Sequence, residues 1–287
     1  MQFSDKFIGY IDILGFKSFV DAAENGAGLS LAELVELLSL LGKGTERAHF
    51  EAHGPSTCPQ APCIERHLDF RVTQISDCVI VSSEVSPAGA INLVSHCWGA
   101  VIELLAKGIM CRGYIKRGRV YHTDGNVIGS GYQDAFAAEC QVSAFGREAN
   151  ERGTPFVEID PEIVQYIESQ SDACVKKMFG RMVKSDGAVT VLFPFQRLRH
   201  SFIVAGDGHR FDAAKERASN QNLRVIIGRM KEQILSFVDS SNASAVTKSK
   251  HYISALDSQL EACDRTDEAI NKLDSLAWCS AGARRSP

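Results

Sequence analysis

The sequence lacks an excess of positive charge. Its 287 residues include 31 Lys and Arg against 35 Asp and Glu, which gives a formal net charge of −4 and an isoelectric point near 6.1. Proteins that hold a nucleic-acid backbone usually present a basic surface. The composition therefore argues against a nucleic-acid partner.

Long apolar runs are scarce as well. Charged residues interrupt the N-terminal stretch MQFSDKFIGYIDILGF, and no later window approaches the roughly 18 apolar residues that a transmembrane helix needs. Nine cysteines, an odd number, are scattered from Cys58 to Cys279 without the spacing of an extracellular disulfide framework. We expect a soluble, cytoplasmic protein with reduced thiols and no membrane partner.

Several familiar site motifs are also missing. The chain has no P-loop, Rossmann or G-x-S-x-G fingerprint. Residues of zinc-binding type occur in and around a proline-rich segment, but they alternate in the order His53, Cys58, Cys63, His67. Structural zinc sites usually bring their ligands in closely spaced pairs, so we assign no zinc site.

The stretch Phe7 to Phe16, FIGYIDILGF, is the most informative segment that is present. Its short apolar run, with Ile8, Tyr10 and Ile11, is typical of a buried strand. The run ends in Asp12. A carboxylate at the end of a central strand is costly unless a cation meets it, and a metal ion is the first partner to expect.

A second carboxylate is predicted at the tip of a hairpin. Two alternating runs over 68–81 are joined by Ser76 and Asp77, which indicates strand, tight turn and strand. If the first strand pairs with this hairpin, Asp12 and Asp77 lie side by side, and two carboxylates with the Ile13 carbonyl suit Mg²⁺ or Mn²⁺. The alternative is structural, because Asp also favours helix caps and turns.

The remaining pattern predicts an α+β fold with a mostly antiparallel sheet and helices on one face. Ser30 and Glu33 form a predicted capping box. The expected elements are a strand at 7–12, helices at 17–23 and 31–41, the hairpin, a helix at 88–106, strands at 109–115 and 119–122, a helix from about 132, strands at 155–159, 189–193 and 202–204, a helix at 213–238, and two shorter helices ending at 278. We divide the chain into a domain at 1–160 and a mostly helical extension at 161–287.

Three segments, FIGYIDILGF, QISDCVIVSS and IGSGYQDAFAAE, resemble the landmark segments of the class III nucleotide cyclase homology domain. The resemblance covers about the first 160 residues. The segment DILGF and the C-terminal extension more closely resemble the bacterial Pycsar pyrimidine cyclases, which make cyclic UMP or cyclic CMP in defence against phage. The class III cyclase fold is a ferredoxin-like or palm-like sheet.

The resemblance implies roles for residues of the first strand and the turn after it. Asp12 and Asp77 would bind two divalent cations, Mn²⁺ or Mg²⁺, with the Ile13 carbonyl as a further ligand. The turn and helix start at Gly15, Phe16 and Lys17 would receive the triphosphate, a task that backbone N–H groups at a helix N-terminus perform well.

Two departures from the purine cyclases concern the transition state. The helix after the glycine motif there presents an Asn and, four residues on, an Arg; the corresponding residues here are Gln133 and Ala137. The missing charge must come from elsewhere. In CRGYIKRG, period-two alternation puts Arg112 on one face with Lys116 and puts Arg117 on the other. We select Arg112 and Gln133 as catalytic candidates; a solvent-facing ion pair is the competing interpretation of Arg112.

Base recognition departs too. The Lys and Asp with which adenylyl cyclases read adenine correspond to Thr73 and Asn126. Short neutral side chains could read a pyrimidine edge, and Phe50 could shorten the pocket; ordinary packing is the alternative for all three residues. The residues do not choose between UTP and CTP, and we place UTP first.

The expected protein is thus a cyclase of pyrimidine nucleoside triphosphates. The resemblance implies a homodimer with active sites at the subunit interface, and a two-fold dimer is the commonest assembly in any case. A catalytically silent, cyclase-like nucleotide sensor is one rival. A polymerase-like palm is another, but it should carry a basic template channel.

Overall fold

The computed structural model describes residues 1–42, 68–148, 150–193 and 212–282. Its elements are β1 (Ser4–Ile13), α1 (Phe16–Glu24), α2 (Leu31–Ser39), β2 (Arg71–Ile75), β3 (Cys78–Glu84), α4 (Pro87–Ala106), β4 (Cys111–Thr123), β5 (Asn126–Ile128), α5 (Ser130–Glu139), β6 (Val157–Ile159), α6 (Pro161–Glu168), α7 (Ala173–Met182), β7 (Val183–Asp186), β8 (Val189–Leu192), α8 (Ala213–Phe237) and α9 (Ala243–Gly282).

One sheet organises these elements, in the order β2-β3-β1-β4-β6-β8-β7 with β5 paired to β4. The pairing of β4 with β6 is parallel and the other pairings are antiparallel. The predicted α+β class with a mostly antiparallel sheet and a helical C-terminal extension is confirmed. Strand β1 lies between β3 and β4, and Phe7, Ile8 and Ile11 in it have no exposed surface, as its apolar run predicts.

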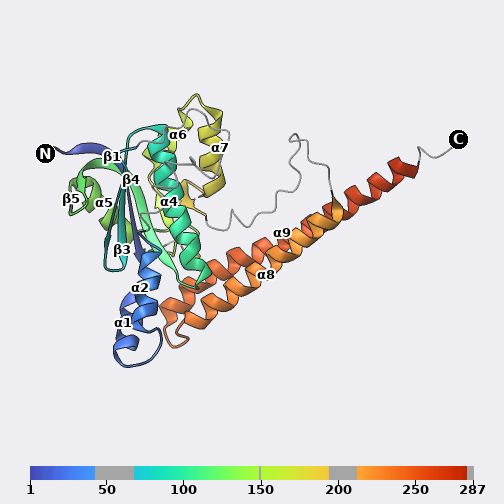
Figure 1. Cartoon of the computed structure of the whole chain (residues 1–287), viewed down its shortest axis with the longest axis horizontal. Coiled ribbons are helices and arrows are strands. Elements are labelled where there is room, and N and C mark those ends of the chain that lie inside the picture. Colours follow the sequence, from blue (N-terminus) through green and yellow to red (C-terminus); the bar gives the residue numbers. More distant parts are fainter. Residues whose placement is uncertain (43–67, 149, 194–211, 283–287) are drawn as a thin grey trace.

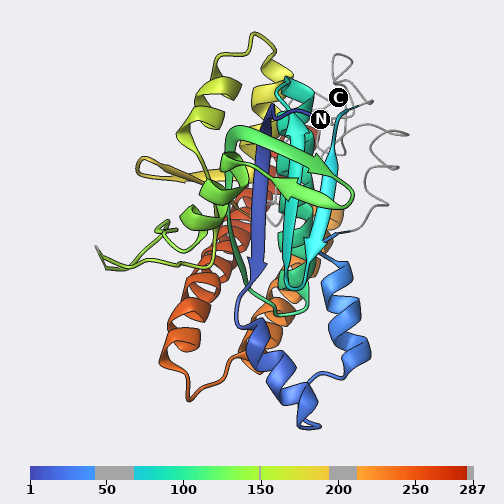
Figure 2. The same cartoon turned by 90° about the vertical axis from the view of Figure 1, so that its left-hand side faces the viewer.

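The two faces of the sheet are covered differently (Figure 1, Figure 2). Because strand side chains alternate, Phe7 and Ile11 pack in the large core that α4, α6 and α7 share. Ile8 and Tyr10 point the opposite way, into a small cluster with Ala135 of α5. Most helices therefore lie on one face as predicted, and α5 is the exception on the other.

Helix α4 is the most apolar helix of the described chain. By length and composition it could cross a membrane, which differs from the expectation that no window comes near that limit, but 72% of the apolar window is buried. It begins at Ser86, whose side chain caps the Gly89 N–H, and ends at Lys107. A buried core helix can have the length and apolar composition of a membrane-spanning helix, and the burial of α4 against the sheet identifies it as a core helix.

Several boundaries differ from the prediction. The strands expected at 109–115 and 119–122 are one continuous strand, β4, because Lys116 and Arg117 fit the alternation and are paired on opposite faces. The two helices expected at the C-terminus are the single helix α9. Strand β7 was not predicted, and the strand expected at 202–204 lies outside the described residues. The capping box of Ser30 and Glu33 is present.

Helices α8 and α9 form an antiparallel hairpin that extends from the sheet (Figure 1). The sequence predicts one apolar stripe on α8, formed by Val225, Ile226, Met230, Ile234, Phe237 and Val238. Met230 and Ile234 are buried as predicted, but Val225 and Ile226 are 43% and 46% exposed, and Ile227, outside the predicted stripe, is buried in the cluster that contains Tyr252 of α9. Strands β7 and β8 continue the same sheet beyond residue 160, and α6 and α7 continue the same core. The predicted division of the chain into a domain at 1–160 and an extension at 161–287 therefore stays a proposal.

Replacing Gly131 by valine is expected to destabilise the protein by about 2 to 3 kcal/mol, as overpacking a tight contact does. A Cβ at Gly131 would lie 2.4 Å from Ile8 Cδ1 and 3.0 Å from Gly118 Cα, so α5 would have to move off the sheet. Urea denaturation measures the change. Gly180→Ala is the control, because a Cβ there meets nothing within 4 Å and alanine favours helix α7. Equal stability of Gly131→Val and wild type would contradict the close approach.

Candidate active site

Asp12 and Asp77 meet at one end of the sheet. Asp12 of β1 lies opposite Cys78 of the neighbouring strand β3 and, on its other side, opposite Arg112 of β4. The turn between β2 and β3 lies next to it, because the Ile13 N–H donates to the Asp77 carbonyl oxygen at 3.1 Å. The two carboxylates that sequence reasoning paired are thus neighbours in the structure. Their role as metal ligands stays a prediction.

The surroundings of Asp12 oppose its negative charge. The pKa of Asp12 is raised to about 7, mainly by burial and then by the nearby Asp77 and Glu139 carboxylates, while Arg112 opposes the rise. Desolvation and like charges both disfavour an ionised carboxylate. A cation beside Asp12 would relieve both effects, so the residues present fit a divalent metal ion.

The donor set for such an ion is incomplete in side chains alone. Within the described residues, no group of three His, Cys, Asp or Glu could hold a metal. A site here must therefore combine Asp12 and Asp77 with a backbone oxygen, for which Ile13 was predicted, and with oxygens of a bound phosphate. That composition is usual for Mg²⁺, which keeps several non-protein ligands.

The start of α1 follows directly. Gly15 adopts a left-handed conformation at φ 77° and no side chain caps the helix, so the first N–H groups of α1 have no side-chain acceptor. Phe16 is buried in the main core and anchors the turn, whereas Lys17 is exposed. Uncapped N–H groups and an exposed cation suit an anionic ligand. Their contact with a triphosphate stays a prediction.

Three of the four Lys and Arg residues of β4, Arg112, Lys116 and Arg117, divide between the two faces as the alternation predicts. Arg112 lies on the Asp12 face, where its Nε donates to Glu139 Oε1 and its NH1 donates to the Gly153 carbonyl oxygen at 3.4 Å. Lys116 pairs with Asp134 at 2.9 Å. Arg117 lies on the other face.

The partners of Arg117 show what that opposite face does. Its guanidinium binds Asp5 at 2.6 Å and Glu162 at 3.2 Å. These contacts tie the outer end of β1 to α6. Arg117 is therefore a structural residue and a useful control for Arg112.

Sequence reasoning missed Glu139 and Lys248. Glu139 ends α5 and is 6% exposed, and its position four residues after the buried Ala135 was the available signal. Lys248 comes from α9; burial lowers its pKa, as does the nearby Arg112, while Glu139 raises it. No local pattern could reveal Lys248, because only tertiary packing brings α9 to this place.

The residues proposed to read the base, and Gln133, have surroundings of their own in the structure. Thr73 hydrogen-bonds His122 Nε2 at 2.9 Å. Asn126 is exposed and pairs with Thr123 in the β4–β5 hairpin, and Gln133 is exposed on α5. Phe50 lies outside the described residues. Among the described residues of a single chain, no hydrogen bond or ion pair links Gln133 or Asn126 to the Asp12 or Asp77 carboxylate.

Lowering the pH should destabilise the protein through His122. Burial lowers the pKa of His122 to about 4, as do the nearby Lys6 and Arg71, and the neutral ring bonds Ser82 and Thr73. The unfolded ring binds a proton near pH 6.5 but the folded ring does not, so stability falls as pH drops from about 6.5 to 4, by about 2 to 3 kcal/mol. Urea denaturation across this range should show a shallower slope for His122→Gln; an unchanged slope would assign the effect elsewhere.

The solved structures that this chain loosely resembles include two nucleotide cyclases. One is the catalytic core of a rhodopsin-guanylyl cyclase with converted specificity in complex with ATPαS, at 12% identity and a TM-score of 0.35, covering 59% of this chain and 84% of that one. The other is a bacterial light-regulated adenylyl cyclase, at 12% identity and a TM-score of 0.37, covering 80% of this chain and 57% of that one. No family model and no curated protein matches the sequence.

Proposed function

We propose that this chain is a metal-dependent nucleotide cyclase that converts a pyrimidine nucleoside triphosphate, UTP ahead of CTP, to the 3′,5′-cyclic nucleotide and pyrophosphate. The observation that carries the proposal is the meeting of Asp12 and Asp77 beside the uncapped start of α1. Two carboxylates and a helix N-terminus at one sheet end can hold cations and a polyphosphate together.

The chemistry is an in-line displacement at the α-phosphorus. The ribose 3′-oxygen loses its proton and forms a bond to the α-phosphorus, and the bond from that phosphorus to the β-phosphate bridging oxygen breaks, so that pyrophosphate leaves. Two divalent cations, Mn²⁺ or Mg²⁺, bound by this site would favour the deprotonated 3′-oxygen and the charge on pyrophosphate. Asp12, Asp77 and the Ile13 carbonyl would hold them, and Gly15, Phe16 and Lys17 would bind the β- and γ-phosphates.

Arg112 would supply the positive charge that an arginine provides in the purine cyclases, where this chain has Ala137. Its guanidinium is on the Asp12 face, and the side chain is only 16% exposed, so its field is weakly screened. In the structure, the Arg112 Nε donates a hydrogen bond to the Glu139 carboxylate. Arg112 would stabilise the pentacoordinate phosphorus after it exchanges part of this contact for phosphate oxygens, and Gln133 would bind ribose.

Pyrimidine selection rests on what replaces the adenine-reading pair. Thr73 and Asn126 are short neutral residues at the positions where adenylyl cyclases read adenine with a Lys and an Asp, and the bulky Phe50 would shorten the pocket. A cyclic pyrimidine nucleotide is a signal rather than a metabolic intermediate, and we assign the enzyme to second-messenger synthesis in bacterial anti-phage defence, in the cytoplasm.

A homodimer would complete the site. The sheet face that carries Asp12 also exposes apolar side chains. Ile75 of β2, which lies opposite Cys78, is 50% exposed. Phe136 of α5, which packs on Tyr10, is 54% exposed. Exposed apolar groups around a catalytic face are typical of an interface. A second copy there would bring its own exposed Gln133 toward Asp12.

A silent nucleotide sensor is the alternative. The Arg112–Glu139 ion pair favours it, because a guanidinium already satisfied by a buried carboxylate is less available to a transition state.

Incubating the pure protein with each of the four triphosphates and Mn²⁺, with mass spectrometry of the products, tests the proposal. We expect cyclic UMP or cyclic CMP from wild type, none from Asp12→Ala, loss in Arg112→Ala and retention in Arg117→Ala, whose partners lie on the opposite face. No cyclic nucleotide from any triphosphate, with nucleotide binding intact, would favour the sensor.

A further inference from the structure

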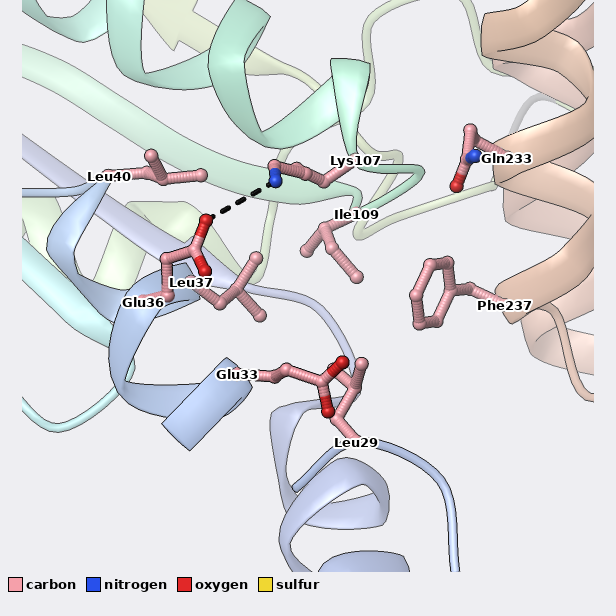
Figure 3. A pocket seen from close by; sticks show the side chains of 9 residues that line it. All are labelled: Leu29, Glu33, Glu36, Leu37, Leu40, Lys107, Ile109, Gln233 and Phe237. Carbon is pink, nitrogen blue, oxygen red and sulfur yellow. Dashed lines mark hydrogen bonds and ion pairs between the residues drawn. The ribbon is translucent and has the colours of Figure 1, made fainter. Parts of the chain in front are cut away.

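Two of the cavities formed by the described residues, both away from Asp12, differ in how their polar groups are satisfied. The first, of about 190 Å³, lies between α2 and α8 (Figure 3). Its charged groups have partners: Glu36 pairs with Lys107 at 3.4 Å, and Glu33 closes the capping box with Ser30. Nothing in this cavity calls for a ligand.

The second cavity, of about 380 Å³, is bounded by the segment after α5, the β7–β8 hairpin and α9. It contains an unsatisfied buried group. Gln259 of α9 lines it, is 6% exposed, and its Oε1 has no hydrogen-bond partner. A buried acceptor without a partner costs about 1 to 3 kcal/mol. The position of Gln259 therefore points to a ligand that donates a hydrogen bond.

The apolar wall of this cavity is aromatic. The ring of Phe145 lies 5.0 Å from that of Phe156 and 5.9 Å from that of Phe193, measured between centroids. Phe156 in turn stacks on Tyr252 of α9, with centroids 5.6 Å apart and an angle of 18°. A flat ring is the group that such a wall accommodates best.

The polar wall is cationic. Lys184 Nζ lies 4.6 Å from the centre of the Phe193 ring and 5.1 Å from that of Phe145, and Arg147 lines the same cavity. The one lining carboxylate, Asp186, accepts the Phe145 N–H at 2.6 Å. An anionic group on the ligand would lie between the two cations.

These walls are fixed before any ligand arrives. Glu158 accepts the N–H groups of Ser143 and Ala144 at 2.6 and 2.9 Å, which holds the segment that carries Phe145. On the other side, His251 of α9 contacts Glu151 at 2.7 Å. A preformed cavity lowers the entropic cost of binding.

We propose that this cavity binds a nucleoside monophosphate, linear or 3′,5′-cyclic. Each nucleobase has a flat face for the phenylalanine wall and an N–H donor for Gln259, and the phosphate provides the charge for Lys184 and Arg147. The volume lies within the range of about 300 to 1,000 Å³ typical of small-molecule sites. The site is separate from Asp12 and does not depend on the proposed cyclase activity.

Calorimetric titration of the full-length protein in EDTA tests the proposal, with UMP, CMP, AMP, GMP and their 3′,5′-cyclic forms as probes. We expect at least one to bind with a Kd below about 100 µM. Lys184→Met and Gln259→Leu should each weaken that binding by about tenfold or more. Gln259→Leu should also melt no earlier than wild type, since it removes an unsatisfied acceptor, and this shows that the variant is folded.

Two control variants localise the binding. Lys177→Met removes an exposed lysine of α7, and Asp12→Asn alters the candidate active site; neither should change the affinity. The proposal is overturned if no probe binds, if Asp12→Asn loses binding that Lys184→Met keeps, or if 4-aminobenzoate binds and no nucleotide does. If the wild-type protein binds a probe but forms no cyclic nucleotide from any of the four triphosphates, the proposed function is rejected and the second binding site is retained.

Discussion

Replacing Asp12 by asparagine should abolish turnover and, in metal-free buffer at pH 8, stabilise the fold. Burial and neighbouring carboxylates raise the pKa of Asp12 to about 7 from an ordinary 3.8, so the folded protein binds a proton there that the unfolded chain has already lost. Wild-type stability therefore falls as pH rises from about 4 to 7, and above that range the ionised carboxylate is a standing cost.

The expected gain for Asp12→Asn is about 1 to 2 kcal/mol above pH 7, after discounting the shift for partial solvent exposure, and close to zero near pH 4. Turnover should fall by at least about 100-fold if Asp12 is the metal ligand that we propose, since the substitution removes its carboxylate. Urea denaturation in EDTA at pH 4.5 and 8, with activity assays, measures both effects. Asp21→Asn, an exposed residue of α1, is the matched control. A loss of stability at pH 8 would mean that Asp12 has a native partner of its own.

Replacing Glu139 by glutamine should destabilise the protein by about 3 kcal/mol. The Glu139 carboxylate is 8% exposed and the Arg112 side chain 16% exposed, and removal of one member of a buried pair leaves the other charge without compensation. The nearby Lys248 adds to the loss, because burial and Arg112 already lower its pKa and Glu139 is the acid that opposes them.

The double variant Arg112→Met, Glu139→Leu should recover most of that stability, since an apolar pair of similar volume often replaces a buried ion pair at little cost. Chemical denaturation of Arg112→Met, Glu139→Leu and the double variant, each compared with wild type, gives the coupling energy as a double-mutant cycle. A double variant as unstable as the sum of the single variants would show that the two side chains do not act as a pair.

Local pattern predicted the faces of strand β4 better than it predicted the bounds of that strand. The alternation of β4 correctly separated Arg112 from Arg117, because a strand places side chains on two faces by geometry alone. The same alternation did not predict that β4 is one strand, because a run of charged residues at its middle looked like an interruption. Pairing with acids on both faces satisfies that run.

Helix faces were harder to predict. On α8 the structure buries Met230 and Ile234 of the predicted stripe, but it exposes Val225 and Ile226 of that stripe and buries Ile227 instead. Period fixes how apolar residues repeat along a helix, but the partner decides which stripe is covered. Here the partner is α9, whose continuity over 40 residues was itself not evident from sequence.

The sequence by itself determined that an apolar strand ends in Asp12 and that a hairpin tip carries Asp77, because strand alternation and turn chemistry are local properties of the chain. It also determined the α+β class. Only the tertiary structure decided that Glu139 and Lys248 surround Arg112 and that Gln259 lies unsatisfied in an aromatic cavity. Those arrangements depend on how α5 and α9 pack on the sheet, and packing joins residues whose separation along the chain carries no signal.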